Sequence, residues 1–172
     1  SGKSGRHEIV LNRTGMEVKI VGTFHLTGNS KHELSLFIVH KAPRTRAETE
    51  LRGVVDDHAS LTLSGTIIIE KKAQKSESFL REKVLLLSPT ARAEAVPNLE
   101  ILADDVKCSH AATISNIPEE QIFYLMSRGL TRKKAEEMIV EGFLSKILTR
   151  EVGKTTAPLV QETQPEMVKI PL

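Results

Sequence analysis

The residue types best suited to chemistry lie within seven positions, 104–110. This segment contains two carboxylates, the chain's one cysteine and an imidazole. If the segment is extended, side chains two positions apart share a face, so Cys108 and His110 would point the same way beside Val106. A thiolate is a soft ligand suited to iron–sulphur chemistry, and an imidazole is the usual alternative ligand on such clusters. Cys108 and His110 are therefore the candidate cluster or metal ligands.

Two ligands from one chain do not complete a cluster site, which needs about four, so this hypothesis requires a second subunit. A plainer interpretation competes with it. Cys108 would then be a small apolar core residue stacked with Val106, and His110 a structural hydrogen-bonding residue. The remaining candidate imidazoles do not have the spacing of metal ligands, and we expect no metal there: His25, His32, His40 and His58.

The chain offers no local support for catalysis. It contains no Gly-x-Ser-x-Gly nucleophile elbow. Its cysteine does not lie in a recognisable cysteine-protease motif with a matched histidine and asparagine. We predict a protein that is not an enzyme. A net charge of +2, from 24 basic and 22 acidic residues, is too balanced for a protein that mainly grips phosphates, so nucleic acid is not an expected partner.

The elements that must position the candidate ligands are mostly strands. From residue 7 to about 73, apolar residues alternate with polar ones in short runs, such as 17–21, 23–26, 60–64 and 66–69. Many short strands with regular turns predict an all-β array, which is either a sandwich or a stacked solenoid. No repeat of fixed period is evident in the sequence, so the pattern leaves both architectures open.

The period changes to about 3.6 at Pro118, which suits a first helical position, and Gly129 suits a helix end. A second helix, capped by Thr131, is predicted to end near Arg150. A helix pair carrying Arg132, Lys133 and Lys134 raises the alternative of a helix-turn-helix DNA reader, but the charges of 118–150 nearly balance. Such a pair is more typical of a packing or docking unit.

Composition limits the number of domains and the cellular environments that we expect for this chain. The 172 residues, 40% of them hydrophobic, suffice for one folded domain. We expect residues 1–6 to be a flexible leader or expression remnant, and residues 151–172, with three prolines, to be a flexible tail. The single cysteine cannot form an internal disulfide, which favours a reducing compartment, the cytoplasm. No apolar run approaches the roughly 18 residues of a spanning helix, so we expect no membrane insertion.

Several ordered blocks resemble the SufB/SufD family of iron–sulphur cluster assembly proteins. The blocks are residues 65–69, 73–75, 85–88, 97–101, 103–110 and 123–130, and the resemblance is clear from about 51 to 147. The Lys-Cys-Ser-His block at 107–110 is more similar to SufD than to SufB.

The resemblance implies a mainly β fold, a right-handed parallel β-helix over 7–117 followed by a small helical subdomain over 118–150. It implies a scaffold subunit whose β-helix pairs edge to edge with a SufB/SufD-like paralogue or a second copy. Cys108 and His110 would lie at that interface, where a transient iron–sulphur cluster is shared and none is held tightly by one chain alone. The helices would dock a SufC-like ABC ATPase, with these partner-binding candidates: Phe123, Tyr124, Arg128, Gly129 and Phe143.

Two consequences remain as expectations. A short solenoid exposes strand edges, which pair readily, so we expect a dimer. The alternative function is a β-solenoid interaction module that mediates assembly without cluster chemistry.

Overall fold

The computed structural model describes residues 2–148, which form eight strands followed by two helices. The elements are β1 Gly2–Leu11, β2 Glu17–Leu26, β3 Lys31–His40, β4 Arg46–Val55, β5 Ser60–Ile69, β6 Glu77–Leu86, β7 Arg92–Ile101, β8 Lys107–Asn116, α1 Glu119–Ser127 and α2 Arg132–Leu148.

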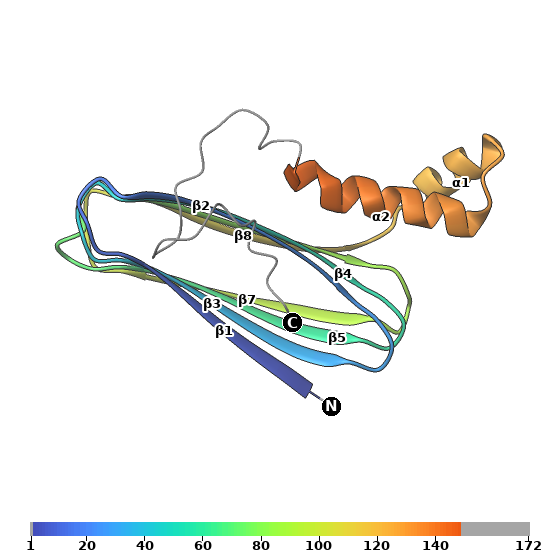
Figure 1. Cartoon of the computed structure of the whole chain (residues 1–172), viewed down its shortest axis with the longest axis horizontal. Helices are drawn as coiled ribbons and strands as arrows, with labels where there is room; N and C mark the ends of the chain where they lie inside the picture. The colour runs from blue at the N-terminus through green and yellow to red at the C-terminus, as the bar shows by residue number, and fades with distance from the viewer. Residues whose placement is uncertain (1, 149–172) are drawn as a thin grey trace, which may run out of the picture.

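The strands build two parallel sheets, in the orders β1-β3-β5-β7 and β2-β4-β6-β8. Successive strands therefore alternate between the sheets, and each pair of strands makes one coil of a β-solenoid of about four turns. Figure 1 shows the two layers of strands lying face to face, joined by turns at both ends. Of the two architectures that the sequence left open, the solenoid is the one that forms, and the predicted β-helix class is confirmed.

Alternation along each strand produces the core. In β5, every second residue is buried, and the same pattern recurs in β2, β3 and β4. Side chains of one face of each sheet meet between the layers, where they form a single aliphatic cluster that includes Leu36, Leu51, Leu63, Ile67 and Leu80. An aliphatic core of this kind needs few aromatic residues, in keeping with their 3% share of the sequence.

The coils do repeat, although the sequence does not make this evident. Gly2 pairs with Lys31 and Ser60 pairs with Arg92, so equivalent positions in successive coils are offset by 29 to 32 residues. At one corner a residue with positive φ recurs in three coils, but its identity changes from Gly15 to Arg44 to Lys75. The backbone register thus repeats from coil to coil, whereas the residue types at equivalent positions do not.

Three expectations about the strands differ from the structure. Residues 2–6 lie in β1, which pairs with β3 along its whole length, and the Arg6 guanidinium lies 4.2 Å from the centre of the Phe37 ring. These residues are part of the sheet, because parallel pairing with β3 satisfies the backbone groups on one side of the strand without an apolar run. The predicted breaks at Gly22 and Gly65 do not occur either, since each glycine continues a ten-residue strand.

The two helices begin close to the predicted positions. Pro118 precedes α1, and Gly129 follows its end with a φ of 93°, a conformation that glycine adopts readily. The Thr131 hydroxyl accepts a hydrogen bond from the Lys134 amide at 3.3 Å, as expected of a cap. The predicted helix end near Arg150 and the predicted tail lie outside the described residues. Between residues 2 and 148, no helix has the length and apolar character needed to cross a membrane.

The helices fold back against the outside of the sheet that contains β8 (Figure 1). Arg52 of β4 makes the attachment. Its guanidinium donates a hydrogen bond to the Phe143 carbonyl at 2.8 Å and lies 5.4 Å from the centre of the Phe143 ring. Glu50 holds the guanidinium in place through two hydrogen bonds of 2.6 and 2.9 Å.

Candidate functional site

Strand β8, which carries both candidate ligands, is the last strand of its sheet. Its one strand neighbour is β6, with Cys108 opposite Ser78 and His110 opposite Leu80. As the sequence predicted, the segment is extended and the two side chains share a face. That face points into the solenoid. Asp104 and Asp105 do not join the pair, since they lie exposed in the turn that precedes β8.

Cys108 is half-buried and packs, with Val106, against the apolar core. Burial raises the pKa of the thiol, because a thiolate is poorly solvated there. This placement agrees with the plainer interpretation of Cys108 as a core residue. It also means that binding iron through this sulphur requires the thiol to lose its proton on binding.

The imidazole of His110 is enclosed. Its Nε2 lies 2.9 Å from Oε2 of Glu82 on β6, and both side chains are 1% exposed. The imidazole Nδ1 and the Glu82 Oε1 have no hydrogen-bond partner among residues 2–148. A cluster ligand here would come from a buried, oriented ring rather than from a mobile surface side chain.

The apolar core is open to solvent at this end of the solenoid. In the sheets, Leu99, Ile101 and Ile114 stand opposite Ile67, Ile69 and Val84, which are at most 2% exposed. The three residues of the last coil are nevertheless 38–50% exposed. Among residues 2–148, strands β7 and β8 thus offer unpaired backbone edges and apolar side chains together, a combination that marks an interaction surface.

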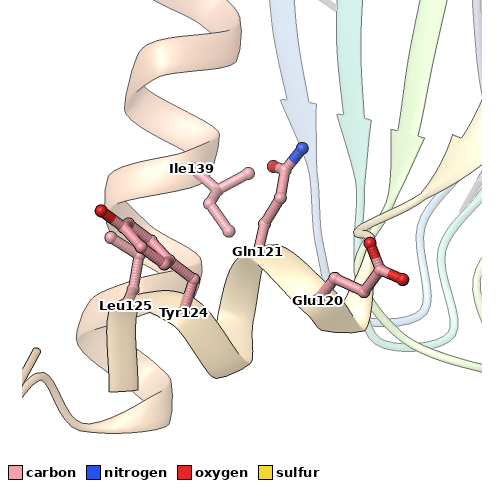
Figure 2. A pocket seen from close by; sticks show the side chains of 5 residues that line it. All are labelled: Glu120, Gln121, Tyr124, Leu125 and Ile139. Atoms are coloured by element: carbon pink, nitrogen blue, oxygen red, sulfur yellow. The ribbon is translucent and has the colours of Figure 1, made fainter. Parts of the chain in front are cut away.

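A second apolar surface lies on the helix pair. A shallow groove between α1 and α2 is lined by Glu120, Gln121, Tyr124, Leu125 and Ile139. Figure 2 shows Ile139 of α2 projecting toward the side chains of α1. The helices also carry exposed large apolar side chains: Phe123 is 75% exposed, and Tyr124, Met126 and Met138 are also exposed.

The predicted partner-binding residues do not all lie on that surface. Phe123 and Tyr124 do, and the Arg128 guanidinium lies 5.1 Å from the centre of the Tyr124 ring. Gly129 ends α1. Phe143 instead faces Arg52 and helps to attach α2 to the sheet, so its contacts are within the chain.

The other histidines are dispersed. His40 is fully buried and its Nδ1 lies 2.7 Å from the Thr45 hydroxyl, whereas His25 and His58 are exposed. Within the described part of the chain, no three His, Cys, Asp or Glu side chains are arranged to hold a metal ion. Cys108 and His110 alone would therefore not complete a cluster site, which needs about four ligands.

Reasoning from the sequence missed Glu82, Gly65 and Arg52. An added Cβ on Gly65 of β5 would lie 2.6 Å from both Glu82 Oε1 and His110 Cε1, so this glycine makes room for the buried pair. Glu82 can be identified as a charged residue at a strand position that faces the core. That position can be assigned only when the register of the coils is known.

Comparison with known proteins agrees with this architecture. The family model described as "SUF system FeS cluster assembly, SufBD core domain" matches residues 4–143. The chain is 33% identical over 153 residues to the protein ABCI7, chloroplastic, of Arabidopsis thaliana, covering 87% of this chain and 32% of that protein. It is 39% identical over 94 residues to the iron–sulfur cluster assembly protein SufD of Escherichia coli, covering 55% and 22%.

A third relative is the iron–sulfur cluster assembly protein SufB of Bacillus subtilis, 32% identical over 120 residues, with 69% of this chain and 26% of that protein covered. The chain thus spans about a third or less of the length of these relatives. The family model, in contrast, covers most of the chain, including the whole described solenoid apart from its first residues. The predicted family is confirmed: the chain belongs to the SufBD core family of the SUF iron–sulphur cluster assembly system.

Proposed function

We propose that this chain is a non-enzymatic scaffold subunit of iron–sulphur cluster assembly, which contributes Cys108 and His110 to a cluster-forming interface. The observation that carries the proposal is the position of these residues in the last strand of a sheet. Within the described strands, each has a strand neighbour on one side only, so a second β-helix that pairs with β8 would bring its own side chains next to them. The cluster is the cargo of this interface, and a partner must complete its ligands.

The exposed end of the core supports the same partner. Leu99, Ile101 and Ile114 have apolar neighbours in the previous coil, and a further strand stacked on β7 and β8 would cover them in the same way. A SufB/SufD-like subunit presents strands of this kind, whether it is a paralogue or a second copy of this chain. Pairing through backbone edges gives affinity, while the inward side chains give specificity.

The helix pair is the proposed docking surface for a SufC-like ABC ATPase. Exposed aromatic and methionine side chains, here Phe123, Tyr124, Met126 and Met138, are typical anchors at protein interfaces. The same helices carry exposed ion pairs, such as Arg132 with Glu119 at 2.6 Å. Exposed apolar and charged side chains on one helix pair suit a protein partner.

Reconstitution tests the proposal. This chain, a SufB/SufD-like subunit and the ABC ATPase are mixed with iron and sulphide, and the cluster is followed by its absorbance. Combined C108A and H110A substitutions are expected to abolish the cluster while the three proteins still co-purify. A control substitution of exposed His25 by alanine should leave the cluster unchanged. A wild-type cluster yield from the double variant would refute the ligand role.

The packing of Cys108 against the core favours one alternative, a β-solenoid interaction module without cluster chemistry. This function also needs the subunit interface and the ATPase surface. It predicts that the double variant forms the same complex with the same cluster yield, so the reconstitution separates the two functions.

A further inference from the structure

Glu82, the enclosed partner of His110, has no role in the proposed function described so far. Glu82 projects inward from β6, His110 projects inward from β8, and their side chains are each 1% exposed. Burying a carboxylate and an imidazole costs free energy unless they satisfy each other. The contact of 2.9 Å between Glu82 Oε2 and His110 Nε2 satisfies one polar atom of each side chain, and it fixes which edge of the ring faces β6.

The opposite sheet confines the pair. Gly65 of β5 lies against both side chains, since a Cβ there would come within 2.6 Å of Glu82 Oε1 and of His110 Cε1. It would also come within 2.7 Å of Leu80 Cδ2. The imidazole is therefore held from two sides, by the hydrogen bond from its own sheet and by backbone from the facing sheet.

The chemistry of the two groups decides where the imidazole proton resides. The ionised form of Glu82 has only acceptors, and opposite that form Nε2 is the nitrogen that donates its hydrogen. In a neutral imidazole the lone pair is then on Nδ1. That atom is buried and has no hydrogen-bond partner within the described residues.

We infer that Glu82 is a positioning residue, which holds His110 in the Nε2–H tautomer and so makes Nδ1 the atom that ligates iron at the subunit interface. The ligand part of this inference rests on the proposed function. Ligating histidines commonly donate their other N–H to a carboxylate, which orients the ring and raises its basicity. Gly65 completes the arrangement by leaving room for the ring and the carboxylate.

The tautomer is measured first, on the full chain alone, by long-range proton–nitrogen NMR of labelled histidine. For His110 we expect Nε2 to have the shift of a protonated nitrogen and Nδ1 that of an unprotonated one. In E82Q the neutral amide can accept or donate, so the ratio of Nε2–H to Nδ1–H should fall about fivefold. An Nδ1–H tautomer in the wild type, or an unchanged ratio in E82Q, would overturn the inference.

Two glycine variants distinguish a specific role of Gly65 in holding the His110 ring from a general effect of overpacking the core. G65A should displace the pair and shift the His110 ratio in the same direction as E82Q. G53A is the matched control, because its Cβ would come within 1.9 Å of the Phe24 ring and meet Phe24 rather than Glu82 or His110. Equal effects of G65A and G53A on His110 would mean that Gly65 has no specific part in holding the ring.

The ligand role is tested in the reconstituted complex. There E82Q should weaken cluster retention about tenfold or more, with the subunits still associated. Histidine labelled with nitrogen-15 only at Nδ1 should couple magnetically to the reduced cluster, and histidine labelled only at Nε2 should not. Coupling from Nε2 would overturn the assignment of the ligand atom. If H110A retains the full cluster, the proposed ligand role and that of Nδ1 both fail, while an E82Q effect on the tautomer would still establish the positioning.

Discussion

Acid should destabilise this solenoid through one buried histidine. His40, at the end of β3, is 0% exposed, and its Nδ1 lies 2.7 Å from the hydroxyl of Thr45. Burial lowers the pKa of His40 from 6.5 to about 4, because the interior disfavours the charged imidazolium. The substitution that tests this effect is His40→Asn. Its side-chain amide replaces the Nδ1 edge of the ring, and the amide does not titrate.

The size of the effect follows from linkage. Above pH 6.5 the imidazole is neutral in the folded and the unfolded chain, so it adds no pH dependence. Between pH 6.5 and about 4 the unfolded chain binds a proton that the folded chain does not, and the free energy of unfolding falls as the pH falls. The loss amounts to about 2 kcal/mol between pH 7 and pH 5, and levels off below the folded pKa.

Urea denaturation of the wild type and H40N, at several pH values from 7 to 5, measures this loss. Other groups titrate in both proteins, so the quantity of interest is the difference in unfolding free energy between them. We expect that difference to move by about 2 kcal/mol in favour of H40N as the pH falls. Exposed His58 supplies the control, since H58N should follow the wild type. A difference that stays constant within about 0.5 kcal/mol would refute the reasoning.

Three further predictions concern surfaces. R52M removes the hydrogen bond to Phe143, so amide exchange in α2 should accelerate about 30-fold while the strands stay protected. R92M removes an exposed arginine that also donates to backbone carbonyls but lies in β7, in the other sheet, and should have no effect on α2. F123S should weaken ATPase binding about 30-fold by calorimetry with an unchanged melting temperature, since this side chain is 75% exposed. I114E should reduce subunit pairing in sedimentation, whereas R81E should not, and equal sedimentation of both would exclude the β7–β8 end as the interface.

Local signals in the sequence predicted much of the fold. Alternating residues indicated strands, and Pro118, Gly129 and Thr131 marked the helix ends, because caps and periodicity depend on neighbours in the chain. The solenoid itself was not decided by the pattern. Its coils repeat in backbone register, while the corner residues Gly15, Arg44 and Lys75 have different side chains, so the architecture came from the family resemblance.

The candidate site was predicted only in part, because the sequence pattern reveals local relations between residues and not contacts between coils. Cys108 and His110 are two apart in one strand, and their shared face follows from strand geometry alone. Glu82 is 28 residues from His110, and Arg52 is 91 residues from Phe143. Contacts across such separations depend on the pairing of coils and the path of α2, which no local pattern contains.

The attachment of α2 at Arg52 has a mechanical consequence. A force on the helices can enter the β-helix by two routes, the covalent chain that follows Asn116 of β8 and the non-covalent contact of Arg52 with Phe143 on β4. The second route is the weaker, and it would give way first. The helix pair would then rotate as a unit about the short connection before Glu119, while β8 stays paired with β6.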